Sequence, residues 1–299
     1  MARREWKWTE HQLEKLGKVN TILEELKDYM PLTLRQIYYQ MVGKGFIDNK
    51  TSQYGMLSNL IKWARIDGRI GWDYIEDRGR TFHNESGWNN DGDFIKQEVD
   101  NFLDDYRRDL LQTQDKYIEV WIEKDALSSI FTKVASPYTV SVVVNKGFTS
   151  ISFLHEFQKR VHSHKYQEIV MLYFGDFDPS GMEMLDAMRT TLQDELDVDC
   201  VTYKRIALLK EDIFKYKLHH NPDALKKKDT RTEKHIKAYG ELAVELDALR
   251  PDVLERKIRE AIEAELDIGA FNKEVSKYRS ELNKINVLKG KVDTFIKTL

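Results

Sequence analysis

The first part of the chain carries apolar residues at helical spacing. In residues 10–28 they recur every three or four positions, which predicts an amphipathic helix with one buried face. A second helix is predicted to begin after Thr33, whose hydroxyl can cap it, and to end at Gly43 and Gly45. The same spacing in residues 52–70 predicts a third helix.

A short hairpin is expected to follow these helices. Residues 68–80 combine a few apolar positions with Gly and Asp, which indicates a small β-wing. Helices followed by a small hairpin are typical of a winged helix-turn-helix. We therefore expect residues 1–85 to form a winged-helix DNA-binding domain. Residues 86–112 are expected to form a linker, with a bridging helix over residues 93–112.

From residue 117 the pattern changes to apolar segments that alternate with helical ones. Such alternation predicts an α/β fold with a parallel sheet covered on both faces. We expect residues 113–210 to form a Rossmann-like domain and residues 211–299 to form a helical C-terminal extension, including a helix within residues 240–267. The predicted strands are residues 117–123, 138–145, 168–177 and 200–208, and the predicted helices lie near residues 125–135, 150–163 and 181–196.

Composition restricts the function only broadly. Hydrophobic residues make up 41% of the 299 residues and charged residues 32%, as in ordinary globular proteins. The net charge of −3 gives no basic footprint overall, although the first eighty residues hold 14 Lys and Arg against 11 Asp and Glu. The single cysteine, Cys200, excludes a disulfide framework and a cysteine-based metal site. No apolar run approaches the roughly 20 residues that span a bilayer, and the start has no apolar signal core, so we expect a cytoplasmic protein with no membrane partner.

Carboxylates stand where two of the predicted strands end. Glu123 ends the first strand, and Asp176 and Asp178 lie in the turn that ends the third. Because the carboxyl ends of parallel strands share one edge of the sheet, these side chains are expected to meet there. Neighbouring carboxylates repel each other, and oxygen ligands favour Mg²⁺, Mn²⁺ or Ca²⁺ over zinc. The pattern predicts a metal site formed by these three residues, and the alternative is a set of solvated strand ends.

The second predicted helix carries two adjacent tyrosines. Tyr38 shares a face with Leu34 and Met41, so it is expected in the core, and Tyr39 is then expected to face outward. An exposed tyrosine beside Arg35 could act as a nucleophile. The alternative for either tyrosine is core packing with a satisfied hydroxyl.

A weaker signal lies after the second predicted strand. Gly147 is followed by Thr149 and Ser150 at a predicted helix start, which makes a turn that favours anions. Lys124 and Lys146 could contact phosphates near it.

Together these segments resemble a known family. The runs WIEKDAL, NKGFTS and FGDFDPSG resemble the Toprim domain in the form found in the A subunit of DNA topoisomerase VI and its meiotic double-strand-break relative. The run LTLRQIYYQMV is similar to the family's catalytic winged helix, which places its nucleophile at Tyr39 and a basic residue at Arg35. The compact C-terminal segments look like those of the mini-A type of phages and mobile elements. The matching Toprim positions are Glu123, Lys124, Ala126, Asp176, Asp178, Pro179 and Gly181.

The resemblance implies a Mg²⁺-dependent enzyme that cleaves double-stranded DNA and is associated with the nucleoid. Glu123, Asp176 and Asp178 would hold Mg²⁺, with Mn²⁺ as a substitute, and Lys124 would lie beside them. Tyr39 would become linked to the 5′ end of the cut strand. A homodimer would make the double-strand break, each tyrosine acting beside the partner's metal.

Two departures keep other functions open. The chain has no ATPase domain, so strand passage would require a separate B-type subunit, and its charge is less basic than that of most DNA-gripping enzymes. Toprim domains also occur in nucleases that use water instead of tyrosine. A third alternative is a non-catalytic DNA-binding protein with a structural metal site.

Overall fold

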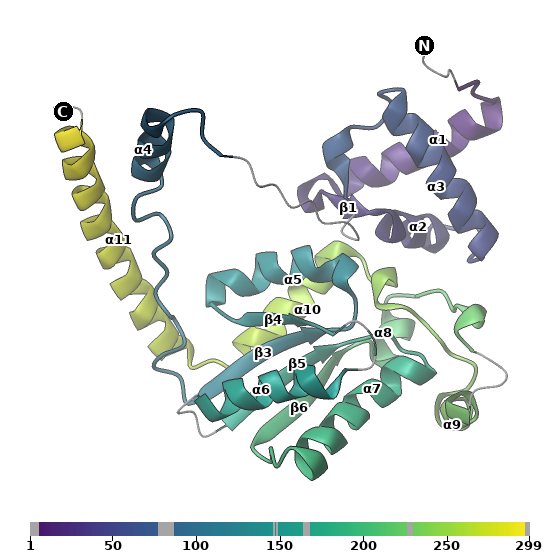
Figure 1. The fold of residues 1–299 in the computed structure, drawn as a ribbon. Helices are drawn as coiled ribbons and strands as arrows, with labels where there is room; N and C mark the ends of the chain where they lie inside the picture. The colour runs from purple at the N-terminus through teal and green to yellow at the C-terminus, as the bar shows by residue number, and fades with distance from the viewer. Residues whose placement is uncertain are drawn as a thin grey trace.

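The structure is a computed structural model that describes residues 6–76, 87–145, 147, 149–163, 168–225 and 230–296. Figure 1 shows a helical N-terminal unit, a parallel sheet with helices on both faces, and a long arm formed by α4 and α11. Across these ranges no helix is both long and apolar enough to cross a membrane.

The N-terminal unit contains the three predicted helices, α1 (Glu10–Glu25), α2 (Leu34–Gly43) and α3 (Thr51–Ile66). Thr33 caps α2 as expected: its hydroxyl accepts from the backbone N–H of Gln36, and the Gln36 side chain accepts from the backbone N–H of Thr33. This reciprocal cap depends only on neighbouring residues, so the sequence locates it correctly.

The expected β-wing is not formed by the described part of residues 68–80. Ile75–Glu76 forms β2, and its partner among the described residues is β1 (Leu32–Thr33), with which it pairs in parallel. The buried side chain of Ile75 anchors this pairing in the core of the unit, over a separation of more than forty residues. The rest of the predicted wing, residues 77–80, lies outside the described residues.

The second unit confirms the α/β class. Its four strands are β3 (Lys116–Ile122), β4 (Ser141–Val144), β5 (Glu168–Phe174) and β6 (Val201–Ala207), all parallel in the order β4-β3-β5-β6. The two central strands, β3 and β5, are nearly continuous apolar runs because helices cover both of their faces. The helices that connect the strands are α5 (Ser128–Ala135), α6 (Ile151–Ser163) and α7 (Pro179–Thr190).

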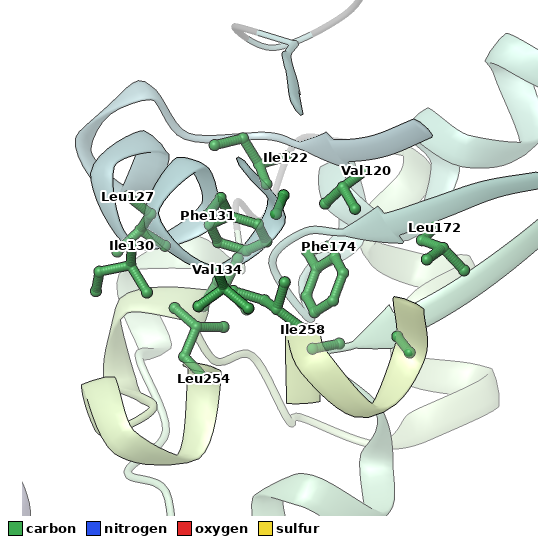
Figure 2. Packing of buried hydrophobic residues seen from close by; sticks show 14 of the residues in the cluster. Val120, Ile122, Leu127, Ile130, Phe131, Val134, Leu172, Phe174, Leu254 and Ile258 are labelled. Carbon is green, nitrogen blue, oxygen red and sulfur yellow. The ribbon is translucent and has the colours of Figure 1, made fainter. Parts of the chain in front are cut away.

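The two faces of the sheet have separate apolar cores. On one face, Phe131 of α5 packs edge-on against Phe174 of β5, and Leu254 and Ile258 of α10 join them (Figure 2). On the other face, Trp121 of β3 packs against Phe157 of α6. Because side chains alternate along a strand, each central strand supplies both cores.

The C-terminal extension is therefore part of the α/β core. Helix α10 (Pro251–Glu263) covers one face of the sheet, after α8 (Lys210–Lys215) and α9 (Thr230–Tyr239). The predicted helix within residues 240–267 is confirmed from Pro251 onward, where proline stands at the helix start as expected. Val244 exchanges two backbone hydrogen bonds with Phe177, which hold residues 241–245 outside any helix.

The predicted bridging helix over residues 93–112 is also shorter than expected. Helix α4 (Asp91–Asp100) ends early, and Leu103 has a left-handed φ of 66°. Further along, the Tyr106 hydroxyl donates to Glu281 at 2.5 Å, and Arg108 binds Glu274 of α11 at 2.7 Å. These charged contacts with α11 (Ile268–Ile296) replace the helical hydrogen bonds of this segment.

Candidate active site at the carboxyl end of the sheet

The structure brings the two predicted acidic clusters together where β3 and β5 end. The Glu123 backbone N–H donates to the Phe174 carbonyl at 3.0 Å, and its Oε2 accepts from the backbone N–H of Asp176 at 2.9 Å. Asp178 caps α7 by accepting from the Gly181 N–H at 2.7 Å. Residue 181 must be glycine because a Cβ there would lie 2.4 Å from the Asp176 carbonyl oxygen.

Asp176 is buried, with both carboxylate oxygens engaged. Its Oδ1 accepts from the Leu246 backbone N–H at 2.7 Å, and its Oδ2 lies 3.0 Å from the Lys124 ammonium. Burial raises the pKa of Asp176 to about 7, and the charges of Glu123 and Glu245 act in the same direction against the Lys124 charge.

Lys124 lies at the centre of the acidic cluster instead of reaching toward solvent. Its ammonium lies 2.6 Å from Glu245, 2.8 Å from Asp247 and 3.0 Å from Asp176, so each of its three protons has a carboxylate partner. Burial opposes its charge, but these carboxylates hold the pKa of Lys124 well above its ordinary value.

The sequence analysis missed Glu245 and Asp247, which come from the turn before α10. Both are buried, and Asp247 Oδ1 is a buried acceptor with no hydrogen-bond donor among the described residues. The signal was present in the run AVELDAL, where two acids interrupt apolar residues. It was misread as one helical stripe, although buried acids of this kind require cationic partners.

Helix α2 delivers Arg35 and Tyr39 to the same cluster. The Arg35 guanidinium lies 3.0 Å from Glu245, and Tyr39 and Glu245 line the same small cavity. Burial raises the pKa of Tyr39, and the negative charge of Glu245 raises it further. The site therefore joins two predicted catalytic residues from one unit with the acids of the other.

The expectation that Tyr39 faces outward is wrong. Its side chain is only 6% exposed, and Tyr38 beside it is buried as predicted, with its hydroxyl donating to Asn49. Tyr39 belongs to the apolar core of the N-terminal unit, against which Ala248 of the other unit also packs. The segment that carries Glu245 thus packs against this core, a contact between residues about two hundred positions apart.

Arg205 is a third residue of the site that was not predicted from the sequence. From β6 it donates to the carbonyls of Gly175 and Asp176 at 3.1 and 2.5 Å, and to the carbonyl of Gly181 at 3.0 Å. Burial lowers the pKa of Arg205. This side chain fixes the turn that carries Asp176 and Asp178.

The predicted anion-binding turn is only partly described. The Thr149 hydroxyl donates to the buried Asn145 side chain at 2.6 Å, so it serves the turn itself. Lys146 lies outside the described residues.

The donor set fits a hard cation in chemical type. Glu123 Oε1 and Asp178 Oδ2 have no hydrogen-bond partner among the described residues, and burial raises the pKa of Glu123, with Asp178 adding to the effect. In the described ranges, no three His, Cys, Asp or Glu side chains are grouped closely enough to hold a metal ion. Asp176 would join Glu123 and Asp178 as a ligand only by releasing Lys124.

Comparisons with known proteins add no assignment. No family model matches the chain, and neither the curated proteins nor the solved structures gave a match.

Proposed function

We propose that the protein is a Mg²⁺-dependent DNA-cleaving enzyme that resembles the A subunit of DNA topoisomerase VI, with Tyr39 as its nucleophile. One observation carries the proposal. A continuous set of ion pairs runs from Arg35 through Glu245 to Lys124 and Asp176, and Tyr39 lines the same cavity as Arg35 and Glu245. Residues that resemble a winged-helix nucleophile and a Toprim acid site thus share one polar network.

The chain's residues supply the parts of a transesterification. The Tyr39 oxygen attacks the phosphorus of a phosphodiester, the bond from phosphorus to the 3′ oxygen breaks, and a 5′-phosphotyrosyl link forms. The phenolic proton passes to Glu245, which lines the same cavity as Tyr39, and the 3′ oxygen takes up a proton. Arg35 balances the charge of the phosphate.

Glu123 and Asp178, with Asp176, are the residues that would hold the cation. Mg²⁺, or Mn²⁺ in its place, would stabilise negative charge on the phosphate and on the departing oxygen. Lys124 would then neutralise Glu245 and Asp247, the contacts that it already makes.

A cavity between the two units supports double-stranded DNA as the substrate. It has a volume of about 500 Å³ and is lined by one stripe of α3, with Arg35 on its wall. Lys62 and Arg65 of that stripe offer positive charge to a phosphate backbone, against Glu76 and Asp125 on the same lining. A homodimer would place two such sites on the two strands. Strand passage would then rely on a separate ATPase subunit.

A second candidate is hydrolysis by an activated water at the same acid site. The burial of Tyr39 favours this candidate. A buried phenol with a raised pKa is a weak nucleophile as long as it stays buried beside Glu245.

Cleavage of supercoiled plasmid with Mg²⁺ tests the proposal and separates the candidates. We expect nicked and linear products from the wild type, and loss of both from Tyr39→Phe and from Asp176→Asn. Tyr74→Phe and Asp186→Asn are matched controls, because both side chains are exposed. Cleavage that survives in Tyr39→Phe but not in Asp176→Asn would leave the water mechanism. Binding without cleavage under any metal condition would leave a DNA-binding protein.

A further inference from the structure

The arm formed by α4 and the distal part of α11 has no apolar core of its own. In the described residues, neither α4 nor the part of α11 after Glu274 contains a buried side chain. Figure 1 shows both helices extending away from the sheet, and Lys289 joins them through the Asp100 carbonyl and Asp104. Seven apolar side chains of the arm are 39% to 62% exposed: Trp88, Phe94, Ile95, Phe102, Val287, Leu288 and Phe295.

Such an arm is not expected to be stable by itself. An isolated helix as short as α4, which has 10 residues, is marginal in water unless it buries an apolar face. Lys289 makes one exposed ion pair, with Asp104, and one hydrogen bond, to the Asp100 carbonyl, and an exposed ion pair contributes little. Trp88 and Phe94 pack edge-on, with ring centroids 4.8 Å apart, but they do so at the surface. The described part of the chain therefore leaves most of the apolar surface of the arm exposed.

The charges of the two helices are opposite. Residues 87–105 contain six carboxylates and one lysine, whereas residues 284–296 contain three lysines and one aspartate. Only part of this charge is matched within the chain. Glu98, Asp105, Lys284 and Lys291 form no ion pair with any other described side chain.

The two helices also carry matching stripes. On α4, Asp91, Ile95 and Glu98 follow one another at helical spacing on one face. On α11, Lys284, Leu288, Lys291 and Phe295 do the same. An acidic and apolar stripe on one helix thus complements a basic and apolar stripe on the other.

We propose that two copies of this chain pair through their arms, with α4 of each copy against the distal part of α11 of the other. A two-fold axis brings each stripe onto its complement, because in such an interface residue i meets j while j meets i. The pairing covers the exposed apolar residues and matches the remaining carboxylates with lysines. It gives the homodimer of the proposed function a specific surface.

Sedimentation of the full-length chain without DNA tests this pairing independently of cleavage. We expect a dimer whose dissociation constant rises at least about tenfold in Leu288→Glu, a cost typical of a central interface residue. Phe214→Glu is the matched control, because Phe214 is also an exposed apolar residue, at 62% against 48% for Leu288, but lies on α8. Circular dichroism checks that each variant is folded.

Reversing the charges on both helices distinguishes direct contact between α4 and α11 from a nonspecific loss of dimer stability. Asp91→Lys with Glu98→Lys should weaken the dimer, and adding Lys284→Glu with Lys291→Glu should restore it. A wild-type chain that remains monomeric at every concentration would overturn the pairing. So would a dimer that is unaffected by Leu288→Glu, or one that the fourfold exchange does not restore.

Discussion

Two buried carboxylates on neighbouring strands differ in how completely their charge is matched by hydrogen-bond donors and cations. Glu119, in the middle of β3, is fully buried, and it accepts from Arg160 at 2.7 Å, from the Tyr117 hydroxyl at 2.8 Å and from the Trp121 indole at 2.8 Å. Its two oxygens accept hydrogen bonds from all three of these side chains. Asp176, at the end of β5, has one backbone N–H and a lysine that also serves Glu245 and Asp247.

The difference separates a carboxylate that stabilises the fold from one that is available for chemistry. A buried charge with a complete set of partners holds its surroundings in place. A cluster with more carboxylates than cations costs free energy, and its pKa values move, as the raised pKa of Asp176 shows. Such clusters concentrate at functional sites. Binding of a cation and a phosphate would change which partners these excess carboxylates have.

Removing the partner of Glu119 should give the largest effect on stability. Arg160→Leu leaves a buried carboxylate without its cation, which should lower the free energy of unfolding by about 3 kcal/mol. We place the cost at the low end of the usual range because the Arg160 side chain is 35% exposed. Lys159→Leu, on the exposed face of the same helix, is the control for urea denaturation. Equal midpoints for the two variants would contradict the role given to Glu119.

Glu265 gives a smaller effect that depends on pH. Burial alone would raise its pKa, but hydrogen bonds from Lys204 at 2.5 Å and Lys116 at 3.1 Å lower the pKa of Glu265 below its ordinary value. The folded state therefore binds fewer protons than the unfolded state near that value, so the contribution is present at neutral pH and is lost as the pH falls.

We expect Glu265→Gln to cost about 1 kcal/mol at pH 7. The difference from the wild type should shrink as the pH falls through the ordinary range of a glutamate, in denaturation series at several pH values. If the difference grew on acidification, Glu265 would stabilise the folded state more at low pH than at neutral pH, which contradicts the lowered pKa.

Asp176→Asn should have the smallest effect on stability, although it should abolish cleavage. The substitution removes one of several carboxylates that compete for Lys124, so we expect the free energy of unfolding to change by less than about 1 kcal/mol, toward greater stability at neutral pH. Thermal denaturation measures it. A loss comparable to that of Arg160→Leu would mean that Asp176 is a structural carboxylate like Glu119.

The sequence located the features that depend on nearby residues. The Thr33 cap and the two central strands follow from local capping and from apolar runs that need no distant information. The parallel sheet then places Glu123 and Asp176 at one edge, as expected. These elements position the predicted acids side by side.

The remaining errors all involve long-range packing. The burial of Tyr39 depends on Glu245, about two hundred residues later, which helix periodicity cannot show. Ile75 pairs with Leu32, more than forty residues away, and Val244 pairs with Phe177 ahead of the helix that begins at Pro251. In each case a distant backbone or carboxylate competed successfully with the local preference.

The most direct test of the central claim is the identity of the residue that becomes linked to DNA. Wild-type protein and DNA would be incubated with Mg²⁺ and denatured, and the nucleotide-bearing peptide would be identified by mass spectrometry. We predict a phosphotyrosyl link on Tyr39 that is absent from Tyr39→Phe and retained in Tyr74→Phe. DNA cut without any linked peptide, or a link on another residue, would contradict the assignment of Tyr39 as the nucleophile.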